Sequence, residues 1–375
     1  MYRAAIIGHT GQGDYGHGLD VVYRDMEDVE VVAVADPDAA GLAAAGQRTG
    51  AARCYTDYRE MLATETVDLV NVCPRQVTHH AEMVIAAAGS GARAIFSEKP
   101  LAATLSQADV MLAACAENNV KVAVAHRRAN PYEQHGKRLV EAGEIGDLQV
   151  LRARGKWDQR SGAEDLAVLG THMMDSMRYF AGADVVWAQS HVSQDGREVC
   201  LDDVHEGPEG IGLIAGNSVA AYFVFANGVT AHFESQPADP GARLNSRSFG
   251  FEAHGTKGII SLRNSPNGEM YIYRHGMFVP DGNLEWQRVL LDEWEAIPAS
   301  DRTHRSNILI ARELILAMEQ DCEVTQASSG RDALAALEMI MAVHESQRLQ
   351  GRVAFPMTNR ENPYQTWRRM IPAGS

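Results

Sequence analysis

The sequence predicts a two-domain α/β protein. A doubly wound, Rossmann-type parallel sheet is expected first, followed by an α+β domain with a mostly antiparallel, open-faced sheet. The chain has 375 residues, more than a single domain usually contains. Apolar runs alternate with helical stretches at first, and alternating strands with turn signals predominate later. We expect a first domain over residues 1–125, a second over 126–357 and a C-terminal tail over 358–375.

Five short apolar runs in the first third are predicted to be buried parallel strands. They are YRAAIIG, VEVVAVAD, VDLVNVCP, RAIFSEKP and VKVAVAH. Helical stretches such as LAAAGQRTG and HHAEMVIAAAGSG lie between them and stop at glycine, as helices commonly do. Ligands of such sheets bind at the carboxyl ends of the strands. The residues that directly follow each run are therefore the candidates for a site.

Beyond residue 126 the pattern changes to strands in which apolar and polar residues alternate. SVAAYFVFANGVTAHFES, with Asn227-Gly228 near its centre, predicts a β-hairpin. VVWAQSHVS, SFGFEAHGTKGIISL and MYIYRHGMFV predict further strands, and SNILIARELILAMEQ and GRDALAALEMIMAVHESQRLQ predict helices. This is more sheet than one layer of helices covers. We therefore expect its open face to join subunits into a homodimer or homotetramer.

The composition argues against several partners. The formal net charge is −15, whereas nucleic acid and anionic membranes attract basic surfaces. No apolar run reaches the ~18 residues of a membrane span, and the first strand begins too early for a signal peptide. The five cysteines are scattered without a CxxC pair, and the histidines lack a metal-ligand spacing. We expect a cytoplasmic protein without a metal.

A glycine-rich turn, IIGHTGQGDYGHG, follows the first strand and precedes a stretch that suits a helix. In a dinucleotide-binding turn, glycines such as Gly8, Gly11 and Gly13 allow the backbone to approach the pyrophosphate. The spacing departs from GxGxxG, because Thr10 stands where the second glycine would be. A plain glycine-rich turn is the alternative.

Asp36 ends the second strand, close to the expected place of an acid that binds the adenosine ribose. Its carboxylate would accept from the ribose hydroxyls and repel a 2′-phosphate. The surrounding ADPD contains no arginine to bind that phosphate. Capping of the next helix is an alternative role, compatible with the first. The turn and the acid together favour NAD as cofactor.

Three strand ends, NVCPRQVTHH, FSEKP and VAVAHRRANP, converge near the expected nicotinamide site. The ammonium group of Lys99 can bind a substrate hydroxyl there and assist loss of its proton during hydride transfer. Taken alone, Glu98-Lys99 would more simply be a solvated charged pair at a strand end.

The sequence resembles the Gfo/Idh/MocA oxidoreductases, named for glucose-fructose oxidoreductase and inositol dehydrogenase. EKP at 98–100 matches the most recognisable motif of that family, and LGTHMMDSMRYFAG at 169–182 resembles its GxHxxD helix. RRANPYEQHGKRLVEAGEIGDLQVLRA at 127–153 is similar to its interdomain segment. The resemblance covers about residues 1–350. The two motifs in this order are much more specific than either alone.

The resemblance implies roles for individual residues. Lys99 and His172 match the catalytic lysine and histidine, and Asp175 matches the last residue of GxHxxD. Asp36 and the glycine turn match NAD-binding positions. Further cofactor contacts are expected from Glu98 and Lys99, and from a loop that resembles TPNxxH with two extra residues: Cys73, Pro74 and His80.

One position departs from the family pattern. Many relatives carry an aspartate four residues before the histidine, where this chain has Val168. Asp165 lies seven residues before His172 and would share a face with it if the stretch is one helix. Asp165 is therefore a catalytic candidate, with a helix cap as the alternative.

Substrate contacts are expected from Lys99 and His172, and from three further residues. His126 and Arg127 follow a strand, so they face the ligand or, alternatively, pack between domains. Trp157 lies in KWDQR, where an aromatic ring beside polar groups suits a sugar. An ordinary surface loop is the alternative there.

The resemblance implies an NAD-dependent dehydrogenase that acts on a hydroxyl carbon of a sugar, polyol or cyclitol. Two alternatives stay open at this point. Some relatives cleave glycosides by transient oxidation followed by elimination, and some are non-enzymatic NAD-binding regulators. Retention of both Lys99 and His172 argues against the regulator.

Overall fold

The computed structural model describes residues 1–238, 248–263, 268–279 and 282–370. The chain forms two compact units. The first unit contains residues 1–129, 209–211 and 300–334, and the second contains residues 130–208, 212–299 and 335–375. One sheet is mostly parallel and the other mostly antiparallel, so the predicted α/β class is confirmed.

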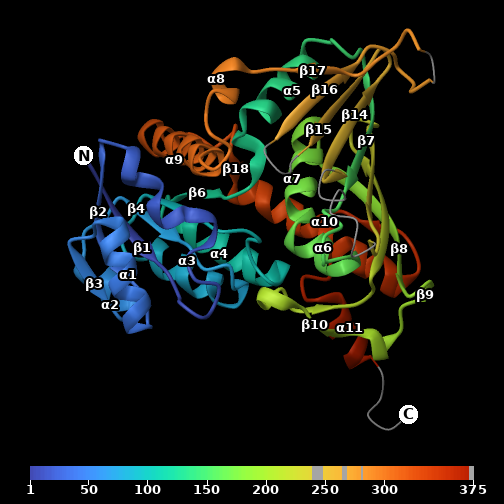
Figure 1. Ribbon diagram of the computed structural model, residues 1–375. Coiled ribbons are helices and arrows are strands. Elements are labelled where there is room, and N and C mark those ends of the chain that lie inside the picture. Colours follow the sequence, from blue (N-terminus) through green and yellow to red (C-terminus); the bar gives the residue numbers. More distant parts are fainter. Residues whose placement is uncertain (239–247, 264–267, 280–281, 371–375) are drawn as a thin grey trace. The chain divides into compact units, whose positions relative to one another are not determined.

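The first unit is built on a seven-stranded sheet in the order β18-β6-β5-β4-β1-β2-β3 (Figure 1). Its strands are β1 Tyr2–Ile7, β2 Val29–Ala35, β3 Arg53–Tyr55, β4 Leu69–Val72, β5 Ala94–Ser97, β6 Lys121–Val124 and β18 Ser328–Ser329. All pairs are parallel except β18 with β6. Its α-helices are α1 Ala39–Thr49, α2 Tyr58–Thr64, α3 His80–Ala88, α4 Leu105–Glu117 and α9 Arg302–Gln320. All four residues of β4 and of β5 are buried, as expected for strands covered on both faces.

Residues 300–334 belong to the first unit, although we expected them in the second domain. The apolar side of α9 places Ile308, Leu314 and Met318 in the same core as Ile6 and Leu19. β18 then adds an antiparallel strand to the edge of the parallel sheet. An amphipathic pattern shows that a helix buries one side, but not which sheet it covers.

The second unit contains a larger sheet in the order β17-β16-β15-β14-β7-β13-β12-β8-β19, with β9 paired to β8. Its strands are β7 Leu148–Arg154, β8 Val185–Gln194, β9 Arg197–Glu198, β12 Ser218–Phe225, β13 Thr230–Ser235, β14 Gly250–Gly255, β15 Ile259–Arg263, β16 Glu269–Tyr273, β17 Gln287–Val289 and β19 Val353–Ala354. Only β13 and β7 are parallel neighbours among these described strands. The hairpin expected at Asn227-Gly228 joins β12 to β13, and Gly228 has a φ of 86°.

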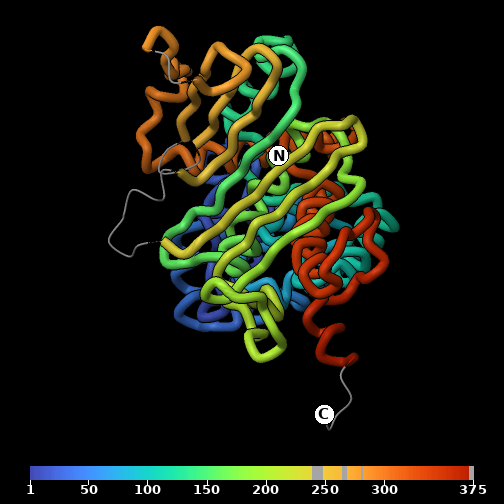
Figure 2. Tube along the Cα trace, turned by 90° about the vertical axis from the view of Figure 1, so that its right-hand side faces the viewer, coloured from blue at the N-terminus to red at the C-terminus, as the bar shows by residue number. Residues whose placement is uncertain are grey.

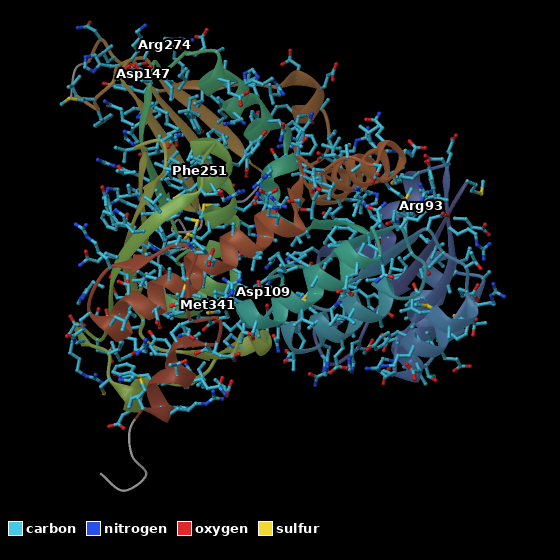
Figure 3. All side chains as sticks on the ribbon, turned by 180° about the vertical axis from the view of Figure 1, so that it is seen from behind. Arg93, Asp109, Asp147, Phe251, Arg274 and Met341 are labelled. Carbon is cyan, nitrogen blue, oxygen red and sulfur yellow. The ribbon has the colours of Figure 1, made fainter. Side chains whose placement is uncertain are left out.

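Helices cover one face of this sheet. They include α5 Pro131–Glu141, α6 Gly162–Val168 and α7 Gly170–Ala181. The helix α10 Gly330–Leu349 belongs to this unit from residue 335 onwards. Phe251 of β14, labelled in Figure 3, packs edge-on against Phe180 of α7 with ring centroids 4.7 Å apart. Figure 2 looks onto the other face, where β7, β13, β12 and β8 cross the view without a described helix in front of them.

The segment expected to be a C-terminal tail is largely folded. It contains α11 Pro363–Arg369, whose N-terminus is capped by the Asn362 side chain. The same side chain donates to the carbonyl of Leu213 at 2.9 Å, and Tyr364 is fully buried against His344. The tail prediction is therefore wrong for residues 358–370, and residues 371–375 lie outside the described part. The contacts that hold this segment are made with distant residues, so the pattern of the segment's own sequence does not predict them.

Candidate functional site

A pocket of about 400 Å³ lies at the carboxyl ends of β1 and β2 in the first unit. This is the edge at which parallel sheets bind nucleotides. The pocket also borders the start of α2 and the first turn of α3. Its walls are formed by Gly8, His9, Ala35, Asp36, Pro37, Thr56, Asp57, Tyr58, Arg59, His79, Glu82 and Met83.

Asp36, expected on the ribose, forms part of the pocket wall but is fully buried. The Thr10 amide donates to both carboxylate oxygens at 3.1 Å, and the Thr10 hydroxyl donates to Oδ2 at 2.7 Å. The Asp38 amide donates to Oδ1 at 2.9 Å. Asp38, not Asp36, caps α1 through a bond from the Gly41 amide, so the helix-cap alternative for Asp36 is wrong.

The backbone of the glycine turn requires glycine at two positions, Gly11 and Gly13. Gly13 has a φ of 89°, and a Cβ there would lie 2.3 Å from the Gln76 amide nitrogen and 2.5 Å from that of Arg75. Gly11 has a φ of 81°, and its amide donates to the Asp14 carboxylate at 2.9 Å. The glycines therefore allow both the left-handed backbone and the close approach of the segment after β4.

The helix expected directly after the turn is not a regular α-helix. Gly16–Asp25 is a 3-10 segment, η1, interrupted at His17 and Gly18 with φ values of 47° and 74°. Positive φ values are incompatible with a continuous right-handed helix. The apolar spacing was interpreted as α-helical, whereas this GHG stretch imposes a different backbone.

Two tyrosines missed in the sequence analysis carry buried hydroxyls near the pocket. Tyr58 lines it, and the ring of Tyr15 lies against Gly8. The Tyr58 hydroxyl has no hydrogen-bond partner among the described residues, whereas Asp36 interacts with the Tyr15 hydroxyl. Burial is the first cause of the raised pKa of both phenols. An unsatisfied buried hydroxyl costs about 1–3 kcal/mol, so the Tyr58 hydroxyl favours a polar ligand in this pocket and fits the adenosine end of NAD. The Asp57 N-cap before Tyr58 was a detectable helix-start signal.

Glu98 and Lys99 follow β5 and are both buried, so the alternative of a solvated pair is wrong. The Lys99 amide donates to one Glu98 oxygen at 2.8 Å, and His17 Nδ1 lies 2.5 Å from the other. Burial raises the pKa of Glu98, but His17 and Lys99 together lower it more, and the net pKa lies below its ordinary value. The carboxylate thereby fixes the backbone of the turn that carries the lysine.

The loop after β4 contains Cys73, Pro74 and, further on, His80. His80 is fully buried with Nδ1 3.0 Å from the Pro100 carbonyl and Nε2 2.7 Å from the Pro74 carbonyl. Burial lowers the pKa of His80 and raises that of the Cys73 thiol. The Cys73 carbonyl accepts from the Gly16 amide at 2.7 Å. These contacts join the loops after β4 and β5 to each other and to the glycine turn.

His126 and Arg127 follow β6. His126 is buried, with Nδ1 3.0 Å from the hydroxyl of Ser328 in β18. Arg127 begins the 3-10 turn Arg127–Ala129 and is half-buried. The contact with Ser328 gives His126 a packing role within the first unit, which is neither of the two roles expected for it.

The GxHxxD segment of the second unit lies on α7. His172 and Asp175 are both buried on this helix. Val168 ends the separate helix α6, and Leu169 stands between the two. Asp165 and His172 therefore do not share one helical face, because the stretch is not a single helix.

Asp165 is fully buried in α6. Its carboxylate accepts from the Lys156 amide at 3.1 Å, the Trp157 amide at 3.3 Å and the Ser235 hydroxyl at 2.7 Å. Burial is the first cause of its raised pKa. Ser161 occupies the N-cap position, so the helix-cap alternative is wrong. Asp165 instead anchors the loop of Trp157, which has a φ of 51° and a buried indole N–H without a partner in the described part of the chain.

Three further observations concern the described residues. No helix among them is long and apolar enough to cross a membrane. No three histidine, cysteine, aspartate or glutamate side chains are grouped there to hold a metal ion. All five cysteines lie in these ranges, and all are free thiols.

Comparison with known proteins gives two family matches. Residues 2–126 match the oxidoreductase family with an NAD-binding Rossmann fold, and residues 134–261 match the GFO/IDH/MocA C-terminal domain. A D-apiose dehydrogenase of Paraburkholderia graminis is 30% identical over 371 residues, covering 94% of this chain and 88% of that protein. A myo-inositol 2-dehydrogenase of Thermotoga maritima is 28% identical over 201 residues, which cover 50% of this chain and 59% of that protein.

Solved structures show the same fold. Levoglucosan dehydrogenase in complex with NADH aligns with a TM-score of 0.74 at 21% identity, over 95% of this chain and 99% of that one. A Rossmann-type unit with a pocket at the carboxyl ends of its strands, followed by an open-faced α+β unit, is an architecture that dinucleotide-dependent oxidoreductases have. The chain belongs to the Gfo/Idh/MocA oxidoreductase family, and its cofactor is NAD. The resemblance inferred from EKP and GxHxxD is confirmed.

Proposed function

We propose that this NAD-dependent oxidoreductase is a dehydrogenase acting on a hydroxyl carbon of a sugar, polyol or cyclitol. The observation that carries the proposal is Lys99, which is 3% exposed at the carboxyl end of β5 and whose backbone is fixed by Glu98. NAD supplies the hydride acceptor. Lys99 binds the substrate hydroxyl and takes up its proton as the C–H bond breaks.

The remaining roles are proposed residue by residue. His172 is a second acid/base or substrate ligand, and Asp175 supports it from the next turn of α7. Arg127 and Trp157 are proposed substrate contacts, and His126 supports the loop after β6. Contacts to NAD are proposed for Gly8, Thr10, Gly11, Gly13, Asp36, Glu98 and Lys99. Cys73, Pro74 and His80 are proposed to position the loops around it.

A sugar is the favoured substrate class. The relative that matches 94% of this chain is named D-apiose dehydrogenase, and other relatives are named for inositols. These names do not favour the glycoside-cleaving or regulatory alternatives. A hydroxyl-rich substrate also suits a loop that combines Trp157 with the charged residues Lys156, Asp158 and Arg160.

We further propose that the first unit binds NAD and that the second binds substrate and forms the subunit contact. A homodimer or homotetramer through the open sheet face is supported by the long uncovered sheet of the second unit. A reducing, cytoplasmic compartment is supported by five cysteines that form no disulfide.

The test is a substrate panel with purified protein and NAD. D-apiose, myo-inositol, levoglucosan and aryl glycosides are compared for NADH formation and for release of the aglycone. Stoichiometric NADH from a free sugar or polyol is expected. Release of aglycone without net NADH would establish the glycoside-cleaving alternative. NAD binding without turnover of any member would argue against the substrate class.

A further inference from the structure

A short hairpin contributes its tip to the first unit. Strand β10 His205–Glu206 pairs antiparallel with β11 Leu213–Ile214. These strands belong to the second unit, whereas the tip residues 209–211 belong to the first. Ile211 in the tip is 5% exposed, although the tips of surface loops are usually solvated. The tip is therefore packed as part of the first unit. We call residues 205–214 the clamp hairpin.

The tip meets the loop after β4 at a position where no side chain fits. Gly210 has a φ of 72°, and a Cβ on it would lie 2.3 Å from Thr78 Oγ1, 2.9 Å from Gln76 Nε2 and 3.0 Å from the Thr78 amide nitrogen. The carboxylate of Glu209 lies 4.0 Å from the guanidinium group of Arg75. Contact between the tip and residues 75–78 therefore depends on glycine at position 210.

The same loop supports the glycine turn. The Arg75 amide donates to the Gly13 carbonyl at 3.2 Å, and a Cβ on Gly13 would lie 2.3 Å from the Gln76 amide nitrogen. Residues 75–78 thus contact the glycine turn through backbone amides, and they contact the clamp hairpin through Gln76 and Thr78. A displacement of this loop would also displace the turn, because contacts this close leave no space for independent movement.

The base of the clamp hairpin is fixed by the C-terminal segment. The Asn362 side chain donates to the Leu213 carbonyl at 2.9 Å. The guanidinium group of Arg368 in α11 donates to the Val204 carbonyl at 2.6 Å. Both bonds are made within the second unit. A segment that is held at its base before its tip docks loses less conformational entropy on docking.

We propose that the clamp hairpin holds the loop after β4 against the glycine turn and thereby positions this turn for NAD. The hairpin acts on the cofactor through residues 75–78, so it is a positioning element and not a cofactor contact. Because coupling between two binding events is reciprocal, bound NAD stabilises the docked tip as much as the docked tip stabilises bound NAD. The inference rests on the proposed contact of the glycine turn with NAD, and it adds the segment that holds the turn in place.

The experiment measures the dissociation constant of NAD for the full chain by fluorescence quenching, with thermal unfolding as a check on folding. Gly210→Val places a branched side chain against Thr78 and is expected to weaken NAD binding about 10-fold. Gly196→Val is the matched control, because Gly196 has a φ of 80° but, apart from its chain neighbours, no described residue within 4 Å of a Cβ. It carries the same left-handed strain and is expected to stay within about 2-fold of the natural protein. Equal dissociation constants for the two variants would overturn the proposal.

Two further measurements test the same contact. Adding Thr78→Ala to Gly210→Val removes the atom nearest to the new side chain and should restore part of the lost affinity. Hydrogen exchange of the natural protein decides the matter if Gly210→Val folds poorly. Saturating NAD should slow exchange of residues 208–212 about 3-fold or more and leave the turn at 195–198 unchanged. Unchanged exchange at 208–212 would overturn the proposal, whereas failure of the natural protein to bind NAD would instead refute the cofactor assignment.

Discussion

At the scale of single residues, the turn after β5 shows how a buried charged pair is built. Glu98 uses one oxygen to fix the Lys99 amide and the other to contact His17. The net pKa of Glu98 is lowered although burial opposes ionisation, because two basic residues face the carboxylate. A negative group is thereby retained beside the lysine at neutral pH. The family motif thus specifies the position of Lys99 as well as its charge.

Lys99→Met tests the proposed proton role of this lysine. Methionine keeps the length of the side chain but removes its charge, so turnover of a confirmed substrate should fall about 10²–10⁴-fold. NAD affinity should change much less, because the glycine turn and Asp36 are proposed to hold the other end of the cofactor. Lys257→Met, at an exposed lysine between β14 and β15, is the control. Steady-state rates decide the matter, and a Lys99→Met protein with most of its turnover would leave the lysine with a structural role only.

At the scale of elements, Asp165 connects three segments of the second unit. It lies in α6, accepts from two amides of the loop after β7, and accepts from Ser235 of β13. Gly155 leaves the necessary space, since a Cβ there would lie 1.9 Å from the carboxylate. The arrangement is that of a residue that positions the Trp157 loop. We therefore expect its substitution to affect substrate binding through the loop.

Asp165→Asn should raise the KM for substrate and lower the free energy of unfolding by about 1–3 kcal/mol, because one amide donor would face donors of the protein. The dissociation constant of NAD should not change. Ser235→Ala removes a single donor and should have a smaller effect on both quantities. A selective loss of kcat beyond 100-fold with an unchanged KM would instead support the catalytic role first considered for Asp165.

Glu252 in β14 provides a pH test of the sheet. Burial raises its pKa, but His254 at 3.2 Å and Arg263 at 2.5 Å lower it more, to about 2 from an ordinary 4.5. A depressed folded-state pKa stabilises the fold above pH 4.5, and this contribution is lost as the pH falls towards 2. Its upper limit is about 3 kcal/mol.

Glu252→Gln should therefore lower the melting temperature at pH 7, and the difference from the natural protein should shrink between pH 4.5 and 2. Glu234→Gln is a matched control, because its bond to Arg154 joins two half-exposed side chains and should contribute little. Thermal melts across this pH range measure both effects. A constant difference at every pH would contradict the assigned pKa.

At the scale of the whole molecule, the open face of the large sheet is the feature that calls for a partner. Trp187, Tyr222 and His232 form a row of rings across β8, β12 and β13, with centroids 5.5 and 5.0 Å apart. Arg352 lies over the Trp187 ring at 4.1 Å. Aromatic residues and arginine are enriched at protein interfaces. This row is the centre of the proposed subunit contact.

Light scattering should give a mass at least twice the 40.9 kDa of one chain at micromolar concentration. Tyr222→Arg would place an unpaired charge in the middle of the aromatic row, so it should shift the protein towards the monomer. Glu60→Gln, on the first unit, changes the charge by the same amount and should leave the mass unchanged. A single species of about 41 kDa for the natural protein would contradict the proposal.

The sequence determined by itself the features that depend on local pattern. The alternation of strands and helices in the first third, the hairpin at Asn227-Gly228 and the motifs around Lys99 and His172 were all predicted. Side-chain periodicity and turn chemistry are set by neighbouring residues, and motif spacing is read directly along the chain.

Only the tertiary structure decided the features that join distant residues. α9 and β18 pack with the first sheet rather than the second. The apolar stripe of a helix shows that one side is buried, but it does not determine which sheet that side packs against. Asp165 took Ser235, 70 residues away, as a partner, and Asp36 took Thr10, 26 residues away. Long-range pairing of this kind depends on how elements meet in space. The local pattern does not encode how elements meet, and this is why Asp36 was recognised as important while Thr10, its hydrogen-bond partner, was noted only as the residue in place of a glycine.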